Sequence, residues 1–545
     1  MRARGRAWRF AVLQRYARRM PPRPLRSVVL ASLLLLAAPA RAETVIPLGG
    51  DVPDDGTEFL LVPFDVPAGT KEIQLDHDDL SAANILDWGL ADEAGKFRGW
   101  GGGNTEPAIV GELAASRSYL AGPIAPGSWK LVIGKAKIKE LPAKYQVAVH
   151  LRDAPTLAAQ SERAPYVAAP ALSKGPRWYA GDFHVHSKES GDAEPSLDVI
   201  AGYARTRGLD FVELSDHNTT SQLDYIGDAQ SRHGDLLFVP GVEFTTYHGH
   251  ANGVGATAWV DHKIGLPGVT IEAAATAFAK QGAIFSINHP ALDLGDTCIG
   301  CSWGFDLDPS LVGAIEIATG GYSEAGKFVD GPAIQMWNKL VQAGHHVVAL
   351  GGSDDHSGGT KMGGLSSPIG NPTTMIFADA LSVGALLDGI RAGRTVVKLQ
   401  GPDDPMIDLT SSVAPEGDTV TTAKTTLKAV VTGGMGTTFH FVHNGIRTDD
   451  EAIDSDPFTT EIEAVPAKDA VDRWRAEIYI KGAPRTITSH VWVKWKAAEV
   501  VTSEPTPAAG GCTCQAGPSE ASGLSALGLA VLGLARRRSA RRRGC

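Results

Sequence analysis

Short runs in which apolar and polar residues alternate fill residues 43–152. Four such runs are Phe59–Val62, Lys71–Leu75, Trp129–Ile133 and Tyr145–Val149. Alternation with a period of two places every second side chain on one face of a strand. Many short strands separated by Pro- and Gly-containing turns are typical of a β-sandwich. We therefore predict an N-terminal β-sandwich over 43–152 and an Ala/Pro-rich linker over 153–176.

From residue 177 the pattern changes to apolar strands that alternate with helical stretches. The predicted strands are Tyr179–His186, Asp210–Leu214, Leu236–Glu243, Ala283–Asn288, Ala314–Ala318, His346–Gly351 and Thr373–Phe377. The predicted helices are Pro195–Arg207, Thr270–Lys280, Pro332–Ala343 and Leu381–Ala392. Repeated strand–helix units favour an α/β domain with a parallel sheet, closed or open, over 177–400. Strand-like runs return over 401–502 and predict a second β-sandwich.

The first 42 residues have the composition of a processing segment. Residues 1–26 contain nine arginines and no acid, Ser27–Ala40 is apolar, and Ala-Arg-Ala precedes Glu43. A basic region, a short apolar region and a small-residue cleavage site are typical of a secretory signal peptide. A transmembrane anchor is the alternative, but the apolar run is shorter than the roughly 20 residues that a span needs.

The other end of the chain also carries a sorting signal. A linker over 503–511 leads to a tail over 512–545 with Cys512, Cys514, an apolar stretch over 521–535 and six arginines after it. Positive charge behind an apolar segment stays in the cytoplasm, which leaves the body of the protein outside. The tail resembles the MYXO-CTERM sorting tail of surface proteins, and a plain C-terminal anchor is the alternative. The resemblance implies a sorting protease and the cell envelope as partners, and a secreted or surface-attached protein.

The formal net charge of −10 hides an acidic body. Without 1–42 and 512–545 the chain has 35 Lys and Arg against 60 Asp and Glu, a net charge of −25. An acidic protein repels polyanions, so no dedicated nucleic-acid binding is expected.

Cys298 and Cys301 form a C-x-x-C pair outside the tail. A zinc knuckle needs a second pair, and none is present. In an oxidising compartment we predict a local disulfide that closes a loop, with a separate metal clip as the alternative.

Histidines and carboxylates concentrate where the predicted strands of 177–400 end. Eleven of the sixteen histidines lie between His184 and His356. In the run DFHVH, His184 and His186 are two residues apart on a strand and leave it on one face. Other strand ends present Asp192, His217, Glu243, His250, His289, Asp354 and His356. Barrel enzymes place catalytic groups at the C-terminal ends of their strands, so these nine residues predict a site for two or three divalent cations, Zn, Mn or Fe.

The ordered motifs HxH, SDHNT, GVExT, GHAN, NHP and SDxH resemble those of the PHP superfamily (polymerase and histidinol phosphatase), and within it the CehA/McbA-type metallohydrolases. The resemblance covers about Trp178–Leu399, and the upstream sandwich also looks like that family's N-terminal domain. It implies a distorted (β/α)7 barrel flanked by two β-sandwiches. It also implies three metal sets: His184, His186, Glu243 and Asp354; Glu243, His250 and His289; and Asp192, His217 and His356.

The expected catalytic residues are Glu243, Asp354 and His217. Candidates that support a ligand or contact the substrate are Asp216, Asn218 and Asn252, with turn capping as the alternative for the first two. Residues expected to be non-ligands are His233, His248, His262, His345 and Asp355. The expected activity is hydrolysis of a small-molecule phosphoester by a metal-activated water, without an organic cofactor. Carboxylester or carbamate hydrolysis, nuclease or nucleotide phosphatase action, and non-catalytic surface binding are alternatives.

Overall fold

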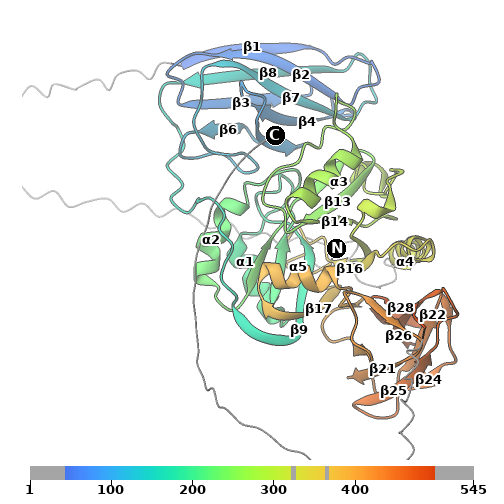
Figure 1. Ribbon diagram of the computed structural model, residues 1–545. Coiled ribbons are helices and arrows are strands. Elements are labelled where there is room, and N and C mark those ends of the chain that lie inside the picture. The colour runs from blue at the N-terminus through green and yellow to red at the C-terminus, as the bar shows by residue number, and fades with distance from the viewer. Residues whose placement is uncertain (1–42, 321–326, 362–366, 498–545) are drawn as a thin grey trace, which may run out of the picture. The chain divides into compact units, whose positions relative to one another are not determined.

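The computed structural model describes residues 43–320, 327–361 and 367–497 (Figure 1). The predicted signal peptide over 1–42, the linker over 503–511 and the tail over 512–545 lie outside these residues. Within the described ranges, no helix is long and apolar enough to cross a membrane.

Two four-stranded antiparallel sheets form a sandwich at the N-terminal side, with strand orders β1-β8-β3-β6 and β2-β7-β4-β5. Their strands are β1 (Glu43–Asp51), β2 (Phe59–Val66), β3 (Glu72–Asp78), β4 (Ile85–Ala91), β5 (Phe97–Gly102), β6 (Ala108–Gly111), β7 (Gly127–Lys137) and β8 (Lys144–Arg152). Alternate residues of each sheet point inward, and Ile73 and Leu75 of β3 share one buried core with Leu131 and Ile133 of β7. This period-two pattern is the one that the sequence shows.

Two sheets of mixed direction make up the central region. In the first, β9 (Ser173–Val185), β10 (Phe211–Leu214) and β11 (Leu237–Pro240) are parallel, and β17 (Thr373–Leu381) and β18 (Thr395–Lys398) extend it antiparallel. In the second, β14 (Ile284–Ile287), β15 (Ala314–Thr319) and β16 (Val348–Gly352) are parallel, and β13 (Gly249–Val254) and β12 (Glu243–Thr246) extend it antiparallel. Single bridges Val185–Asp355 and His217–Glu243 connect the two sheets.

The expected (β/α)7 barrel is not evident, and the structure is a mixed α/β fold dominated by sheets. The predicted strand 236–243 ends at Pro240, and a hairpin of β12 and β13 follows it. This hairpin reverses the chain without a helix, and β17 returns antiparallel beside β9. Apolar runs of similar length form parallel and antiparallel strands, so the strand pattern alone does not separate these topologies.

Five α-helices are found among the described residues: α1 (Leu197–Thr206), α2 (Leu223–Arg232), α3 (Ile271–Lys280), α4 (Lys327–Gln342) and α5 (Val383–Arg391). Ser196, Thr270 and Ser382 cap three of them, because each side chain accepts a hydrogen bond from the backbone N–H three residues on. None of the predicted helices covers α2, whose N-cap residue Gln222 makes no side-chain cap.

A second sandwich follows the central region. One sheet has the order β19-β21-β25, with β19 (Met406–Ser411), β21 (Thr425–Thr432) and β25 (Phe458–Ala464). The other contains β22 (Thr438–His443), β26 (Val471–Ile480), β27 (Ala483–Thr488) and β28 (Val491–Trp495), with short β20 (Thr419–Thr422), β23 (Ile446–Arg447) and β24 (Glu451–Ala452). Because β27 pairs with β18, this sheet is continuous with the first central sheet.

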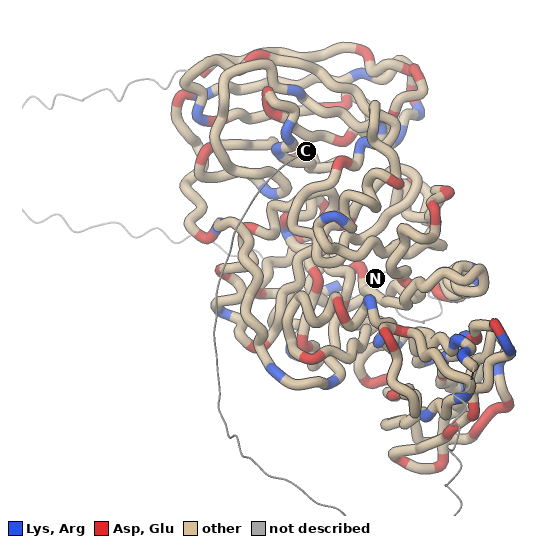
Figure 2. Tube along the Cα trace, viewed as in Figure 1, with Lys and Arg blue, Asp and Glu red and all other residues tan. Residues whose placement is uncertain are grey.

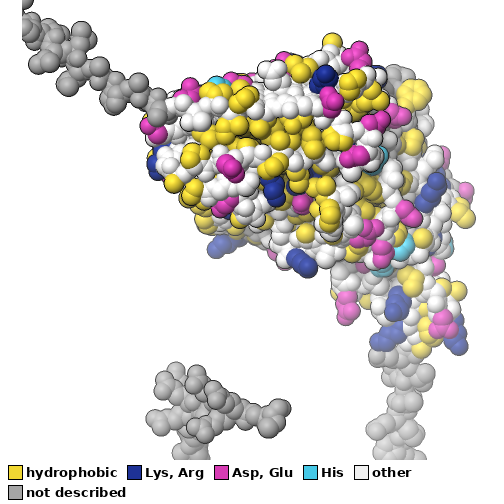
Figure 3. Space-filling model, turned by 90° about the horizontal axis from the view of Figure 1, so that it is seen from above, with side chains coloured by type: hydrophobic (Ala, Val, Ile, Leu, Met, Phe, Trp, Pro, Cys, Tyr) yellow, Lys and Arg dark blue, Asp and Glu magenta, His cyan; other side chains and the backbone are white. Residues whose placement is uncertain are grey.

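Charged residues of both signs are dispersed along the described chain (Figure 2). Seen from above, the face of the N-terminal sandwich shows hydrophobic side chains gathered between charged ones (Figure 3).

Candidate metal centre

The nine predicted ligands converge at the ends of the central strands. His184 and His186 lie at the end of β9, His217 follows β10, Glu243 begins β12 and His250 lies in β13. The remaining four are Asp192, in the loop after β9, His289, after β14, and Asp354 and His356, after β16. The strand ends are held together by backbone pairing, since the residues His217 and Glu243 form a parallel bridge.

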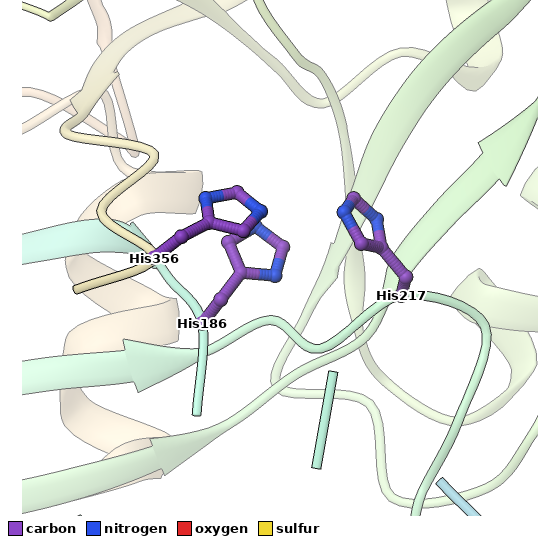
Figure 4. A group of neighbouring side chains, drawn as sticks. All are labelled: His186, His217 and His356. Carbon is purple, nitrogen blue, oxygen red and sulfur yellow. The ribbon is translucent and has the colours of Figure 1, made fainter. Parts of the chain in front are cut away.

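Ligand atoms of these residues form groups in which every pair lies within 4.8 Å. Three groups consist of predicted ligands: His186, His217 and His356; His184, His186 and Asp354; and His184, Glu243 and His289. A fourth joins His250 and His289 to Cys301, whose sulfur belongs to the disulfide with Cys298. Figure 4 shows the first group: the rings of His186 and His356 lie beside one another, with centroids 4.0 Å apart, and His217 points toward them from another loop.

Glu243 lies at the centre of the cluster and is completely buried. Its Oε1 is 3.3 Å from His184 Nε2, 3.2 Å from His250 Nδ1 and 3.2 Å from His289 Nε2. Its Oε2 is 2.7 Å from His217 Nδ1. The two oxygens therefore face different sets of histidines, as expected for a carboxylate between two cations.

Two aspartates complete the cluster. Asp354 Oδ1 is 3.2 Å from both His184 Nε2 and His186 Nε2. Asp192 Oδ2 is 3.3 Å from His217 Nε2 and 3.4 Å from His356 Nε2, although the Asp192 side chain is 57% exposed. The structure thus brings each aspartate to the histidines with which the sequence analysis grouped it.

The carboxylates of the cluster raise the pKa values of the histidines beside them. Burial lowers the pKa of His184, but Glu316, Asp354 and Glu243 outweigh it and hold this pKa well above 6.5. The pKa of His356 rises to about 9, because Asp192 and Asp354 outweigh its burial. Without a metal, the carboxylates therefore keep protons on these histidines, in the place where a cation would supply positive charge.

Unpartnered buried atoms test whether the residues fit a metal. His184 Nε2, His186 Nε2, Glu243 Oε2 and both ring nitrogens of His250 are buried and make no hydrogen bond among the described residues, and the contacts that several of them do make are ion pairs within the cluster. Such atoms cost about 1–3 kcal/mol each when they stay unsatisfied. Imidazole nitrogens mixed with carboxylate oxygens are the donors that Zn, Mn and Fe accept, so the residues fit these ions.

Two buried residues that the sequence analysis missed orient the cluster. Glu316 of β15 accepts a hydrogen bond from His184 at 2.8 Å from Nδ1, and another from the His289 backbone N–H. The Asn288 amide donates to Glu243 Oε1 at 3.0 Å. Glu316 lies in the otherwise apolar strand AIEIAT, and an acid in such a strand is the signal that could have identified it.

The structure also places the three predicted supporting residues. Asp216 accepts from the backbone N–H and Oγ of Ser187, rather than from His217. Asn218 bonds to both backbone groups of Thr245, whose Oγ1 lies 2.7 Å from His217 Nδ1. Asn252 Oδ1 accepts from the Asn288 amide at 2.8 Å, so Asn252 supports Glu243 through Asn288. None of these three residues contacts a predicted ligand side chain through these bonds. Asn218 reaches His217 through Thr245, and Asn252 reaches Glu243 through Asn288.

His248 lies close to the ligands in sequence but points elsewhere. Its side chain is 60% exposed, and its Nε2 is 2.6 Å from Glu58 Oε1 of the N-terminal sandwich. Asp355 is buried and accepts hydrogen bonds from the backbone of Ser357 and Gly359. It shapes the loop after His356 instead of joining the cluster.

The pair Cys298 and Cys301 forms a disulfide, with its Cα atoms 5.6 Å apart. The backbone oxygen of Cys301 is 3.1 Å from His289 Nδ1. The disulfide loop is thus fastened to a predicted ligand, and it lines a cavity of about 740 Å³ that opens over Glu243, His217 and Asp354.

Comparisons with known proteins give only distant similarities. No protein-family model matches the chain, and neither does any curated protein. A two-domain protein of Bacteroides vulgatus, named as containing a predicted PHP-like metal-dependent phosphoesterase, is 18% identical, covers 61% of this chain and 100% of its own, and has a TM-score of 0.35. An amidohydrolase of Chromobacterium violaceum is 18% identical, covers 34% of this chain and 93% of its own, and has a TM-score of 0.23. These scores are too low to support a function, which must rest on the site itself.

Proposed function

We propose that this chain is a metal-dependent phosphoesterase of the PHP superfamily, of the CehA/McbA type, that acts on a small-molecule phosphoester. The observation that carries the proposal is the position of Glu243, completely buried between two sets of histidines. The order of the motifs along the chain supports the family, and the unpartnered buried nitrogens support the metals.

The three proposed metal sets are those that the resemblance of the motifs implies. The first would be held by His184, His186, Glu243 and Asp354, the second by Glu243, His250 and His289, and the third by Asp192, His217 and His356. When bound, divalent cations polarise an ester oxygen and lower the pKa of a water toward neutrality.

The protein's own contribution is to fix the donors. Glu316 accepts from His184 Nδ1 and so leaves Nε2 facing the cluster, and Thr245 sets the ring of His217. Glu243, Asp354 and His217 are the proposed catalytic residues, because each of them contacts members of more than one set.

Metal analysis combined with a substrate screen tests the proposal. The purified mature protein should carry two to three equivalents of Zn, Mn or Fe, and should hydrolyse phosphate mono- or diesters. Chelation should abolish the activity, and the same metal should restore it. Less than one equivalent in a folded, metal-replete preparation would contradict the metal sets. If the protein hydrolyses carboxyl or carbamate esters and no phosphoester, it is a carboxylester or carbamate hydrolase and not a phosphoesterase.

A further inference from the structure

The N-terminal sandwich holds two of the loops that carry predicted ligands. Ser118 Oγ donates to the backbone oxygen of Glu189 at 2.8 Å, and Arg117 Nη1 donates to that of Ala193 at 3.1 Å. These contacts lie on both sides of Asp192. Thr219, two residues after His217, donates through Oγ1 to the Ser118 backbone oxygen at 3.1 Å. The sandwich is therefore packed directly on the loops that carry Asp192 and His217.

The same sandwich forms one wall of the cavity over the cluster. Its lining residues are Asp87 of β4, Trp100, Gly101 and Gly102 of β5, and Gly103 and Asn104. Residues 101–103 are all glycines, so this part of the wall consists of backbone beside the ring of Trp100 and leaves open space there. At Gly191, an added Cβ would lie 2.5 Å from the Gly101 oxygen, which shows how closely the metal loop approaches this wall.

Asp87 is held in place on this wall by Tyr247. The Tyr247 hydroxyl, from the turn between β12 and β13, donates to Asp87 Oδ2 at 2.7 Å. The Tyr247 hydroxyl lies close against β7, since a Cβ added at Gly134 would lie 2.1 Å from its oxygen. A tyrosine of the metal-bearing region thus fixes a carboxylate of the sandwich inside the same cavity as Glu243 and His217.

We propose that Asp87, positioned by Tyr247, is a specificity residue that accepts hydrogen bonds from hydroxyl groups on the alcohol part of the substrate. This inference rests on the proposed phosphoesterase function and names its substrate class, a phosphate ester of a polyol. A carboxylate repels a phosphoryl group, so the phosphoryl group belongs at the metals and a hydroxyl donor belongs at Asp87.

Two further observations support this assignment. The cavity of about 740 Å³ lies within the roughly 300–1,000 Å³ of small-molecule sites and leaves room beyond a phosphoryl group. Burial raises the pKa of Asp87 to about 6, although the hydrogen bond from Tyr247 and the charge of His217 lower it. The charge of the Asp87 carboxylate is therefore lost as the pH falls through about 6.

Steady-state kinetics of the metal-loaded full chain test the proposal with two substrates. Glycerol 1-phosphate carries hydroxyl groups on its alcohol part, and p-nitrophenyl phosphate does not. Asp87→Asn should raise KM for glycerol 1-phosphate by about 10- to 100-fold, the loss expected for one charged hydrogen bond, and leave kcat within about twofold. KM for p-nitrophenyl phosphate, inhibition by inorganic phosphate and metal content should stay at the wild-type values.

Tyr247→Phe should also raise KM for glycerol 1-phosphate, but by a smaller factor than Asp87→Asn. If Asp87→Asn does not fold, the KM of Tyr247→Phe tests the role of Asp87 instead. Asp65→Asn is the matched control, since Asp65 is an exposed acid of β2 in the same sandwich. Equal losses with both substrates, or an unchanged KM for glycerol 1-phosphate, overturn the inference. A wild-type enzyme that cleaves only carboxyl esters overturns the phosphoesterase function instead. The variants are then compared on carboxyl esters with and without hydroxyl groups on the alcohol part. Asp87→Asn should again raise KM for the hydroxyl-bearing ester alone.

Discussion

Glu243 illustrates how a single buried carboxylate can organise a site. A carboxylate without a counter-charge is expensive to bury, and the pKa values of Glu243 and Asp354 are nevertheless held well below their usual range by the histidines around them, against the effect of burial. The positive charge comes from protons on His184 and His217, whose pKa values are raised well above 6.5. Bound cations would displace these protons, so the affinity for metal should fall as the pH falls.

Glu243→Gln keeps the shape of this side chain but removes a negative charge and a strong ligand oxygen. We expect hydrolysis to fall by more than the roughly 10–100-fold that follows the loss of a residue that only supports a ligand. Metal content should fall too, while the melting temperature stays in the folded range. Activity at saturating metal and elemental analysis measure these effects. His248→Gln is the control, because His248 is exposed and contacts Glu58. Full activity in Glu243→Gln would refute the bridging assignment.

At the scale of elements, the β12–β13 hairpin and the disulfide loop form a unit beside the cluster. A Cβ at Gly300 would lie 2.3 Å from the Thr246 oxygen, so the loop packs on the backbone of the hairpin turn. Ile299 of the loop lines the cavity, together with Leu292 and Leu294 of the segment before it. The disulfide is therefore placed to hold the apolar part of the cavity wall.

Alkylation without a reductant should leave Cys298 and Cys301 unlabelled in the native protein, as mass spectrometry would show. Replacing both by Ser should raise KM, because the cavity wall loosens, and should leave the metal content near wild type, because Glu316 still holds the His289 backbone. If the double variant instead loses one equivalent of zinc while the main cluster stays loaded, the pair is a separate metal clip.

At the scale of the whole molecule, the described fold begins with a strand that is fully paired. All of β1, from Glu43 to Asp51, pairs with β8, and the last described strand ends at Trp495. Removal of 1–42 and of the tail therefore takes no described strand away. It would leave the acidic body of net charge −25, with the N-terminal sandwich built into the candidate site.

Processing at both ends remains a prediction, motivated by the Ala-Arg-Ala sequence before Glu43 and by the cysteine-containing tail. Mass spectrometry of the native protein should find an N-terminus near Glu43 and no C-terminal arginine cluster. The processed form should be found at the cell surface or in the medium. Recovery of the intact chain from the cytosol would contradict secretion and the sorting tail.

The sequence by itself indicated the central strands other than β12, β13 and β18, four of the five described helices and the nine side chains that the structure brings together. These signals are local: apolar periods define the elements, and polar residues directly after a strand mark its exposed end. Only the tertiary structure decided the direction of the strands, because a hairpin and a helical crossover join similar apolar runs. It alone also decided where Glu316, Asn288 and Asp87 lie relative to the site. Each of these residues contacts a neighbour far away in sequence, and that neighbour is set by the way the sheets pack.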